Sequence, residues 1–154
     1  MRPEIAPGAR FPDFVLPDHT GVRRRLSDLG DQLMVIVLTR GAFCPKDRQH
    51  MLELMRFYPQ LVIGHAQPVT ITTDDWHTTN NYRQQTNAHW PFLYDEERIV
   101  QRTLDIKEYT DTVHDVMIPH TIVLGRDLEI YKVYNGYYYW GARLWASSTA
   151  TCGN

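Results

Sequence analysis

The chain has 154 residues, 16 of them basic and 18 acidic, and a formal net charge of −2. This length suits one domain with a proper core, and the near-neutral charge gives no reason to expect binding to nucleic acid or to an anionic membrane. The N-terminus lacks the apolar stretch of a signal peptide, and no segment reaches the roughly 20 apolar residues of a membrane span, so we expect a cytoplasmic protein.

The first third of the chain predicts a lead-in, a hairpin and a buried strand. Residues 1–10 are rich in Pro, Gly and charge, and we expect a loose lead-in there. Two short strand-like pieces flank the turn signal Asp18–Gly21 and predict a hairpin. The continuous apolar run Met34–Leu38 favours a buried central strand.

A helix and a second strand are predicted next. Pro45 suits the first position of a helix, and the apolar face that follows extends to about Tyr58, where Pro59 is expected to end the helix. The alternating and β-branched residues of Pro68–Thr73 predict a second core strand. A polar helix is expected from about Asp75 to Gln85.

The second half of the chain predicts one more helix and a closing pair of strands. After the short apolar piece Trp90–Tyr94, the segment Asp95–Leu104 suits a helix with acids in its first turn. Thr121–Leu124 and Glu129–Tyr134 form a pair of strands around the turn at Gly125–Asp127. This βαβ alternation followed by a hairpin predicts an α/β sandwich.

The C-terminal residues carry no clear pattern. Ala146–Asn154 has neither helical periodicity nor a strand pattern, so we expect one domain over residues 1–145 and a disordered tail over 146–154. The aromatic strip Tyr137–Trp140 either packs under a helix as the end of the last strand or mediates association. If no helix covers it, the apolar surface left open predicts a homodimer or a partly unstable fragment.

Cys44 is the candidate nucleophile, because it stands where the predicted central strand passes through a Gly turn into the next helix. Unpaired amide donors at a helix start stabilise a thiolate, and the cation of Arg40 acts in the same direction, so we expect a lowered pKa for this thiol. Asp47 opposes this by repulsion unless its carboxylate is hydrogen-bonded elsewhere, for example as a cap. The alternative is an inert cysteine in the core.

Four segments carry a resemblance to a known family: Gly8–Asp18 with Gly21, Arg40–Asp47, Ile118–Pro119 and Tyr131–Gly136. Together they resemble the thioredoxin fold, and more narrowly the peroxiredoxin-like redoxins of the alkyl hydroperoxide reductase and thiol-specific antioxidant family. The resemblance extends over residues 8–141. It implies a three-layer α/β sandwich with a central mixed sheet and an N-terminal β-hairpin.

The resemblance also implies a thiol-dependent oxidoreductase that needs no bound cofactor. Cys44 is then the nucleophile, with Arg40 as the group that stabilises an anion and Thr39 as a nearby hydroxyl. Gly41 gives the backbone room for a substrate to approach, and Pro45 lies beside it at the helix start.

A second part of the expected substrate site comes from the segment before the last hairpin. By resemblance, Pro119 is cis and lies beside the sulfur, where the backbone at Ile118 pairs with an extended substrate. The alternative is a trans proline that opens a strand. His120 follows Pro119, and we expect it to contribute to substrate binding, although a lone histidine is more often a structural residue.

Two departures from the family pattern limit the functional inference. Peroxiredoxins carry Pro-x-x-x-Thr-x-x-Cys, whereas the Pro and Thr positions here hold Val37 and Gly41. Thioredoxins carry Cys-x-x-Cys, whereas the second position here holds Asp47, which excludes a local dithiol cycle.

Three functions remain open for a single reactive thiolate. It can attack a hydroperoxide and form a sulfenic acid, which an external thiol or Cys152 as resolving thiol reduces. It can instead exchange with mixed disulfides such as glutathione adducts, or the chain can be a thioredoxin-fold binding module without activity. Of these functions we favour the first, with a hydroperoxide as the substrate. His114 and His120 lack a third ligand at a recognisable spacing, so no metal site is expected.

Overall fold

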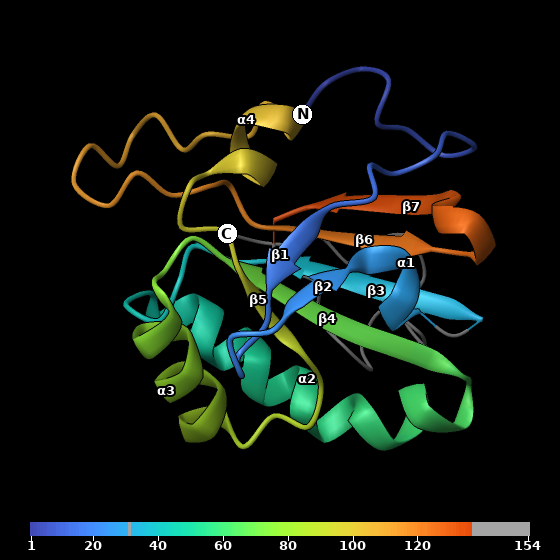
Figure 1. Cartoon of the computed structure of the whole chain (residues 1–154), viewed down its shortest axis with the longest axis horizontal. Coiled ribbons are helices and arrows are strands. Elements are labelled where there is room, and N and C mark those ends of the chain that lie inside the picture. The colour runs from blue at the N-terminus through green and yellow to red at the C-terminus, as the bar shows by residue number, and fades with distance from the viewer. Residues whose placement is uncertain (31, 137–154) are drawn as a thin grey trace.

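The protein consists of a five-stranded mixed sheet flanked by helices and a separate two-stranded N-terminal hairpin (Figure 1). The structure is a computed structural model that describes residues 1–30 and 32–136. The strand order in the sheet is β5-β4-β3-β6-β7. In chain order the elements are β1 (Val15–Pro17), β2 (Arg23–Arg25), α1 (Leu26–Leu29), β3 (Leu33–Leu38), α2 (Pro45–Ile63), β4 (Ala66–Thr72), α3 (Trp76–Thr86), β5 (Phe92–Tyr94), α4 (Ile99–Leu104), β6 (His120–Leu124), a 3-10 turn η1 (Arg126–Leu128) and β7 (Ile130–Asn135).

Strand β3 is the centre of the sheet, as its apolar run predicts. It pairs in parallel with β4 and antiparallel with β6, and its residues from Met34 to Leu38 are all buried. A strand that is covered on both faces needs apolar side chains at every position, which explains the absence of alternation.

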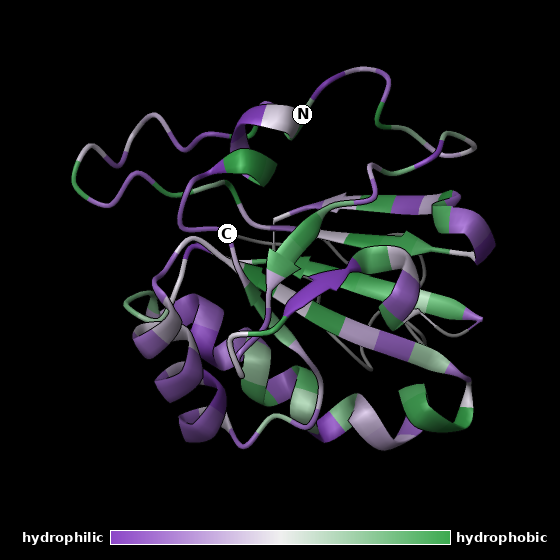
Figure 2. Ribbon diagram, in the orientation of Figure 1, coloured by the Kyte–Doolittle hydropathy of each residue, from purple (hydrophilic) through white to green (hydrophobic). Residues whose placement is uncertain are grey.

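The two faces of β3 lie against two different apolar cores. Ile36 and Leu38 pack with residues of the hairpin and α4 in what we call the hairpin-side core. Val35 and Val37 pack with residues of α2 and α3 in what we call the α2-side core. Figure 1 shows α2 and α3 together on one side of the sheet, and Figure 2 shows mostly apolar central strands beside a hydrophilic β2 and α3.

The predicted fold class is confirmed: the protein is an α/β sandwich of the thioredoxin type with a mixed central sheet and an N-terminal β-hairpin. In the hairpin, Val15 lies opposite Arg25, and the turn between the strands is closed by Asp18. One oxygen of this carboxylate accepts the backbone N–H groups of Thr20 and Val22 at 2.8 and 3.1 Å.

Pro59 does not end the second helix, contrary to the sequence prediction. Helix α2 continues through it to Ile63 and ends at Gly64. A proline inside a helix removes a hydrogen bond and costs about 3 kcal/mol, so other contacts must stabilise the last turn. Leu61 supplies one, because it is buried in the α2-side core beside Ala66 and Val35.

The prediction of a loose lead-in is wrong as well. The backbone N–H of Arg2 donates to the carbonyl of Leu104 at 3.0 Å, and that of Gly8 donates to the carbonyl of Ile130 at 2.8 Å. The segment therefore runs along α4 and β7, where backbone hydrogen bonds that composition does not reveal hold it in place.

Three predictions fall outside the residues that the structure describes: the aromatic strip Tyr137–Trp140, the tail Ala146–Asn154 and the resolving role of Cys152. Within the described residues, no helix has both the length and the apolar character to cross a membrane.

Candidate active site

Cys44 is the N-cap residue of α2, at the position that the Pro45 helix start predicts. Its backbone N–H donates to the carbonyl of Gly41 at 3.2 Å, and its own carbonyl accepts the N–H of Arg48 at 3.1 Å. The residue is buried, with 8 % of its surface exposed. Neither of the two apolar cores of the described residues includes it. The loop before the helix, residues 39–44, is called the Cys44 loop below.

Asp47 holds the Cys44 loop from the first turn of α2. One carboxylate oxygen accepts the backbone N–H of Arg40 at 2.5 Å and that of Gly41 at 3.3 Å, and the side chain is buried. An activated thiol requires this carboxylate to be hydrogen-bonded elsewhere, because its charge would otherwise repel a thiolate. The geometry meets that condition, because the negative charge of Asp47 is shared with two amide donors.

A second carboxylate, that of Asp74, holds the loop from the end of β4. It accepts the backbone N–H of Ala42 at 2.9 Å. Gly41 has φ +131°, and a Cβ at this position would come within 2.8 Å of an Asp74 oxygen, so the close approach requires glycine. Burial raises the pKa of Asp74, although the hydrogen bond from Ala42 opposes this.

Arg40 lies on the loop as predicted, and its guanidinium forms an ion pair with Glu108, with Nη2 and Oε2 3.0 Å apart. A hydrogen bond from Thr110 has the largest effect on the pKa of Glu108, and together with the contacts with Arg40 it outweighs burial and holds that pKa below its ordinary value. Next along the loop, the ring of Phe43 stacks on His114 with ring centres 3.8 Å apart. The segment 107–118 therefore lies against the Cys44 loop at two points.

Thr39 directly follows β3, and its buried side chain carries a hydroxyl that has no hydrogen-bond partner among the described residues. Strand alternation places it on the same side of the sheet as Val35 and Val37, the side that α2 covers. Thr121 lies opposite Val37 in β6 and carries a second buried hydroxyl of this kind. Thr39 was predicted from the sequence as a site residue, whereas Thr121 was not.

The prediction of a cis bond before Pro119 is wrong, because no peptide bond in the described part of the chain is cis. The trans form is the more stable one for X-Pro bonds, and Pro119 takes the place that a sheet permits, directly before β6. Ile118 donates its N–H to the carbonyl of Ile106 at 2.7 Å, and its own carbonyl lies 2.9 Å from Nδ1 of His120. Pairing of Ile118 with an extended substrate would require these bonds to break.

His120 is buried opposite Leu38 in the sheet. Burial lowers the pKa of this imidazole, despite the opposing hydrogen bond to the carbonyl of Ile118. Since a carbonyl oxygen can only accept, Nδ1 carries the proton. His120 is therefore a neutral residue fixed by the backbone, which fits the structural role weighed for it.

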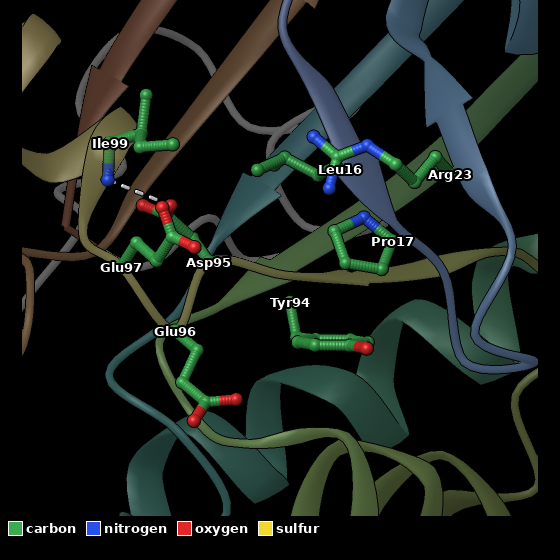
Figure 3. Close-up of a pocket in the computed structure, with 8 residues that line it drawn as sticks. All are labelled: Leu16, Pro17, Arg23, Tyr94, Asp95, Glu96, Glu97 and Ile99. Carbon is green, nitrogen blue, oxygen red and sulfur yellow. Dashed lines mark hydrogen bonds between the residues drawn. The ribbon is translucent and has the colours of Figure 1, made fainter.

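A pocket of about 80 Å³ lies between the hairpin and the start of α4, away from the predicted thiol site (Figure 3). Its lining contains none of the predicted site residues. Asp95, which lines it, is turned toward α4 and accepts the N–H groups of Ile99 and Val100, both at 2.8 Å. The carboxylate serves as a helix-start acid, as the sequence predicts.

Arg48 and Tyr82 also lie near the Cys44 loop and were not predicted from the sequence. Arg48 donates from Nε to the carbonyl of Ala42 and lies over the ring of Tyr82, 5.6 Å from its centre. Its position one helical turn after Cys44 was a usable signal, because residues four apart share a helix face. Tyr82 comes from α3, and no sequence pattern connects it to this loop.

Residues 1–30 and 32–136 contain no group of three His, Cys, Asp or Glu side chains that could hold a metal ion. His114 instead pairs with Asp111, with 2.9 Å between Nδ1 and Oδ2.

Comparison with known proteins agrees with the fold. A model of the AhpC/TSA family matches residues 7–133, while no curated protein matches the chain. Peroxidoxin BcpB from Mycobacterium tuberculosis is 24% identical, with a TM-score of 0.78 over 89% of this chain and 90% of that one. PrxQ from Xylella fastidiosa is 16% identical, with a TM-score of 0.75 over 87% of each chain. AhpC from Enterococcus faecalis is 11% identical, with a TM-score of 0.73 over 86% of this chain and 81% of that one.

These structures share the fold, and the family model spans most of the sequence. The chain therefore belongs to the AhpC/TSA family, as the sequence predicts, and is a peroxiredoxin-like redoxin with the thioredoxin fold.

Proposed function

We propose that the protein is a thiol-dependent peroxidase that reduces hydroperoxides through Cys44. The observation that carries this proposal is the position of Cys44 as N-cap of α2, directly after the central strand, in a chain of the AhpC/TSA family. Amide donors at a helix start favour an anion at the cap. The sulfenic acid formed by the first step is then reduced by an external thiol.

The limited exposure of Cys44 favours a peroxide over a disulfide as substrate. Only 8 % of the residue is exposed, and the exposed ring of Phe43 stands beside it. Thiol–disulfide exchange needs a second sulfur with its whole carrier to approach the thiolate. A hydroperoxide presents two small oxygen atoms, which need less room.

Two carboxylates and two of the predicted site residues act on the loop that presents the sulfur. Asp47 and Asp74 fix the backbone N–H groups of residues 40–42. The unpartnered hydroxyl of Thr39 supplies a polar contact for an oxygen on the α2 side of the sheet. Arg40 supplies positive charge at the loop, tempered by its ion pair with Glu108.

The test is hydrogen peroxide consumption by the full chain with dithiothreitol as reductant, comparing the wild type with Cys44→Ser and Cys152→Ser. We expect turnover in the wild type and in Cys152→Ser and none in Cys44→Ser. In parallel, oxidised glutathione replaces the peroxide, and the mass added at Cys44 is followed. Rapid formation of a mixed disulfide with slow peroxide consumption would overturn the proposal in favour of an exchange enzyme, and inertness to both reagents would favour a binding module.

A further inference from the structure

Tyr82 lies in α3 with its side chain completely buried and its hydroxyl without a hydrogen-bond partner among the described residues. Its ring packs edge-on against Phe92, with ring centres 5.7 Å apart. A buried tyrosine normally finds a partner for its hydroxyl, and an unsatisfied one costs folding free energy. A hydroxyl kept in this state therefore requires an explanation.

Arg48 connects this tyrosine to the Cys44 loop. Its guanidinium lies 5.6 Å from the centre of the Tyr82 ring, and Nη1 donates to the side chain of Gln85 at 2.8 Å, one turn further along α3. The same side chain donates from Nε to the carbonyl of Ala42 at 2.5 Å, and its backbone N–H donates to the carbonyl of Cys44. The loop and the face of α3 that carries Tyr82 are thus held together by one arginine.

The groups that act electrostatically on the hydroxyl are those of the thiol site. Burial raises the pKa of Tyr82, and the negative charges of Asp47, Cys44 and Asp74 act in the same direction, with Arg48 opposing them. The hydroxyl consequently keeps its proton and remains a hydrogen-bond donor. What it lacks is an acceptor, and one would arrive with a substrate that brings oxygen atoms to the sulfur.

We propose that Tyr82 is a further catalytic residue, whose hydroxyl donates a hydrogen bond to an oxygen of the hydroperoxide that reacts with Cys44. This inference rests on the proposed peroxidase function and adds a residue to it. The proposal explains why the Tyr82 hydroxyl has no partner among the described residues, because its acceptor is present only while the peroxide is bound.

The reaction shows where such a donor acts. The Cys44 thiolate attacks the terminal oxygen of ROOH, and the S–O bond forms as the O–O bond breaks. Sulfur is oxidised to the sulfenic acid and the peroxide is reduced to ROH, whose alkoxide takes up the proton that the thiol released. The departing oxygen gains negative charge, and a donor already in place without water around it stabilises that charge most effectively.

The test is the variant Tyr82→Phe, which removes only the hydroxyl. The rate of Cys44 oxidation by hydrogen peroxide is measured by stopped flow, and the rate of Cys44 alkylation by iodoacetamide is measured on the same protein. We expect the peroxide rate to fall at least about tenfold, the effect of losing one hydrogen bond in the transition state. Alkylation should stay within about twofold, because iodide leaves without a donor, and the melting temperature should hold or rise, since an unsatisfied buried hydroxyl has been removed.

Tyr58→Phe is the matched control, because Tyr58 lies about 21 Å along α2 from Cys44 and both rates should stay at the wild-type value. If Tyr82→Phe oxidises as fast as the wild type, or if both of its rates fall by the same factor, the assignment of Tyr82 is overturned while the peroxidase proposal stands. If the wild type itself reacts with peroxide no faster than a free thiol, the peroxidase proposal fails, and with it the reaction that Tyr82 was proposed to assist.

Discussion

The carboxylate of Asp47 accepts the backbone N–H of Arg40 at 2.5 Å, although the two residues lie seven positions apart on either side of Cys44. This bond closes the Cys44 loop into a ring whose shape the first turn of α2 controls. Asp74, two residues after β4, acts on the same loop through the N–H of Ala42. The position of the sulfur therefore depends on two carboxylates that the chain supplies from different elements.

Replacement of Asp47 by alanine should destabilise the fold by about 1–3 kcal/mol, because two loop amides lose their acceptor in a buried place. Urea unfolding measures this change. Glu53→Ala on the same helix is the control and should stay within about 0.5 kcal/mol of the wild type. Equal midpoints for Asp47→Ala and Glu53→Ala would show that the ring around Cys44 adds no stability.

Gly41→Ala should destabilise the protein more than Gly8→Ala. Both glycines have positive φ, +131° and +91°, but only at Gly41 does a Cβ meet other atoms, the oxygens of Asp74 at 2.8 and 2.9 Å. Backbone strain of this kind costs about 1–3 kcal/mol, and the contact with Asp74 adds to it. Comparing the melting temperatures of the two variants separates the effect of the contact with Asp74 from that of backbone strain. Equal melting temperatures for Gly41→Ala and Gly8→Ala would show that a Cβ at position 41 is not crowded by Asp74.

Asp18 should stabilise the hairpin in a manner that depends on pH. Burial alone would raise its pKa, but hydrogen bonds from Thr20, Arg24 and two backbone amides outweigh it and lower the pKa from 3.8 to about 2. Because the folded-state pKa is depressed, the carboxylate's contribution to the free energy of unfolding is fully present above pH 3.8 and is lost as the pH falls through about 2. Its size is about 2 kcal/mol.

The free energy of unfolding of Asp18→Asn, measured in urea, checks this. The difference in free energy of unfolding between the wild type and Asp18→Asn should decrease by about 2 kcal/mol when the pH is lowered from 6 to 2. Asp28→Asn, at an exposed carboxylate in α1, serves as the control. A deficit for Asp18→Asn that is constant over this range would refute the ionic contribution.

His114→Ala should make Cys44 easier to alkylate. The imidazole stacks on Phe43 with planes 4° apart, and this contact ties the segment 107–118 to the Cys44 loop. An aromatic pair contributes about 0.5–1.5 kcal/mol, so its loss should raise the iodoacetamide rate about two- to tenfold through easier local opening. His77→Ala, at an exposed site in α3, should leave the rate unchanged, and an unchanged rate for His114→Ala would mean that the stack does not limit access.

The features that were predicted correctly depend on local signals. The apolar run Met34–Leu38 is the central strand, and Pro45 marks the helix start that makes Cys44 a cap. Both relations lie within one turn or one strand, so the sequence contains both partners. The carboxylate of Asp47, expected to serve as a first-turn cap, instead accepts the loop amides of Arg40 and Gly41, seven and six positions earlier.

The features that were missed depend on contacts between distant segments. Helix α2 passes through Pro59 because Leu61 is buried against other elements, which local propensity does not reveal. The bond before Pro119 is trans although the family resemblance implied cis. Tyr82 is connected to the Cys44 loop through Arg48 because α3 packs beside α2, and no spacing in the sequence encodes that approach.

The most direct test of the account is a single oxidation of the fully reduced protein by one equivalent of hydrogen peroxide, with dimedone present to trap sulfenic acid. Peptide mass spectrometry then locates the adduct. The account predicts one adduct on Cys44 in the folded wild type, formed much faster than on the same protein unfolded in urea, and none at this position in Cys44→Ser. An adduct confined to Cys152, or an equal rate in the folded and unfolded protein, would contradict the claim that the fold activates Cys44.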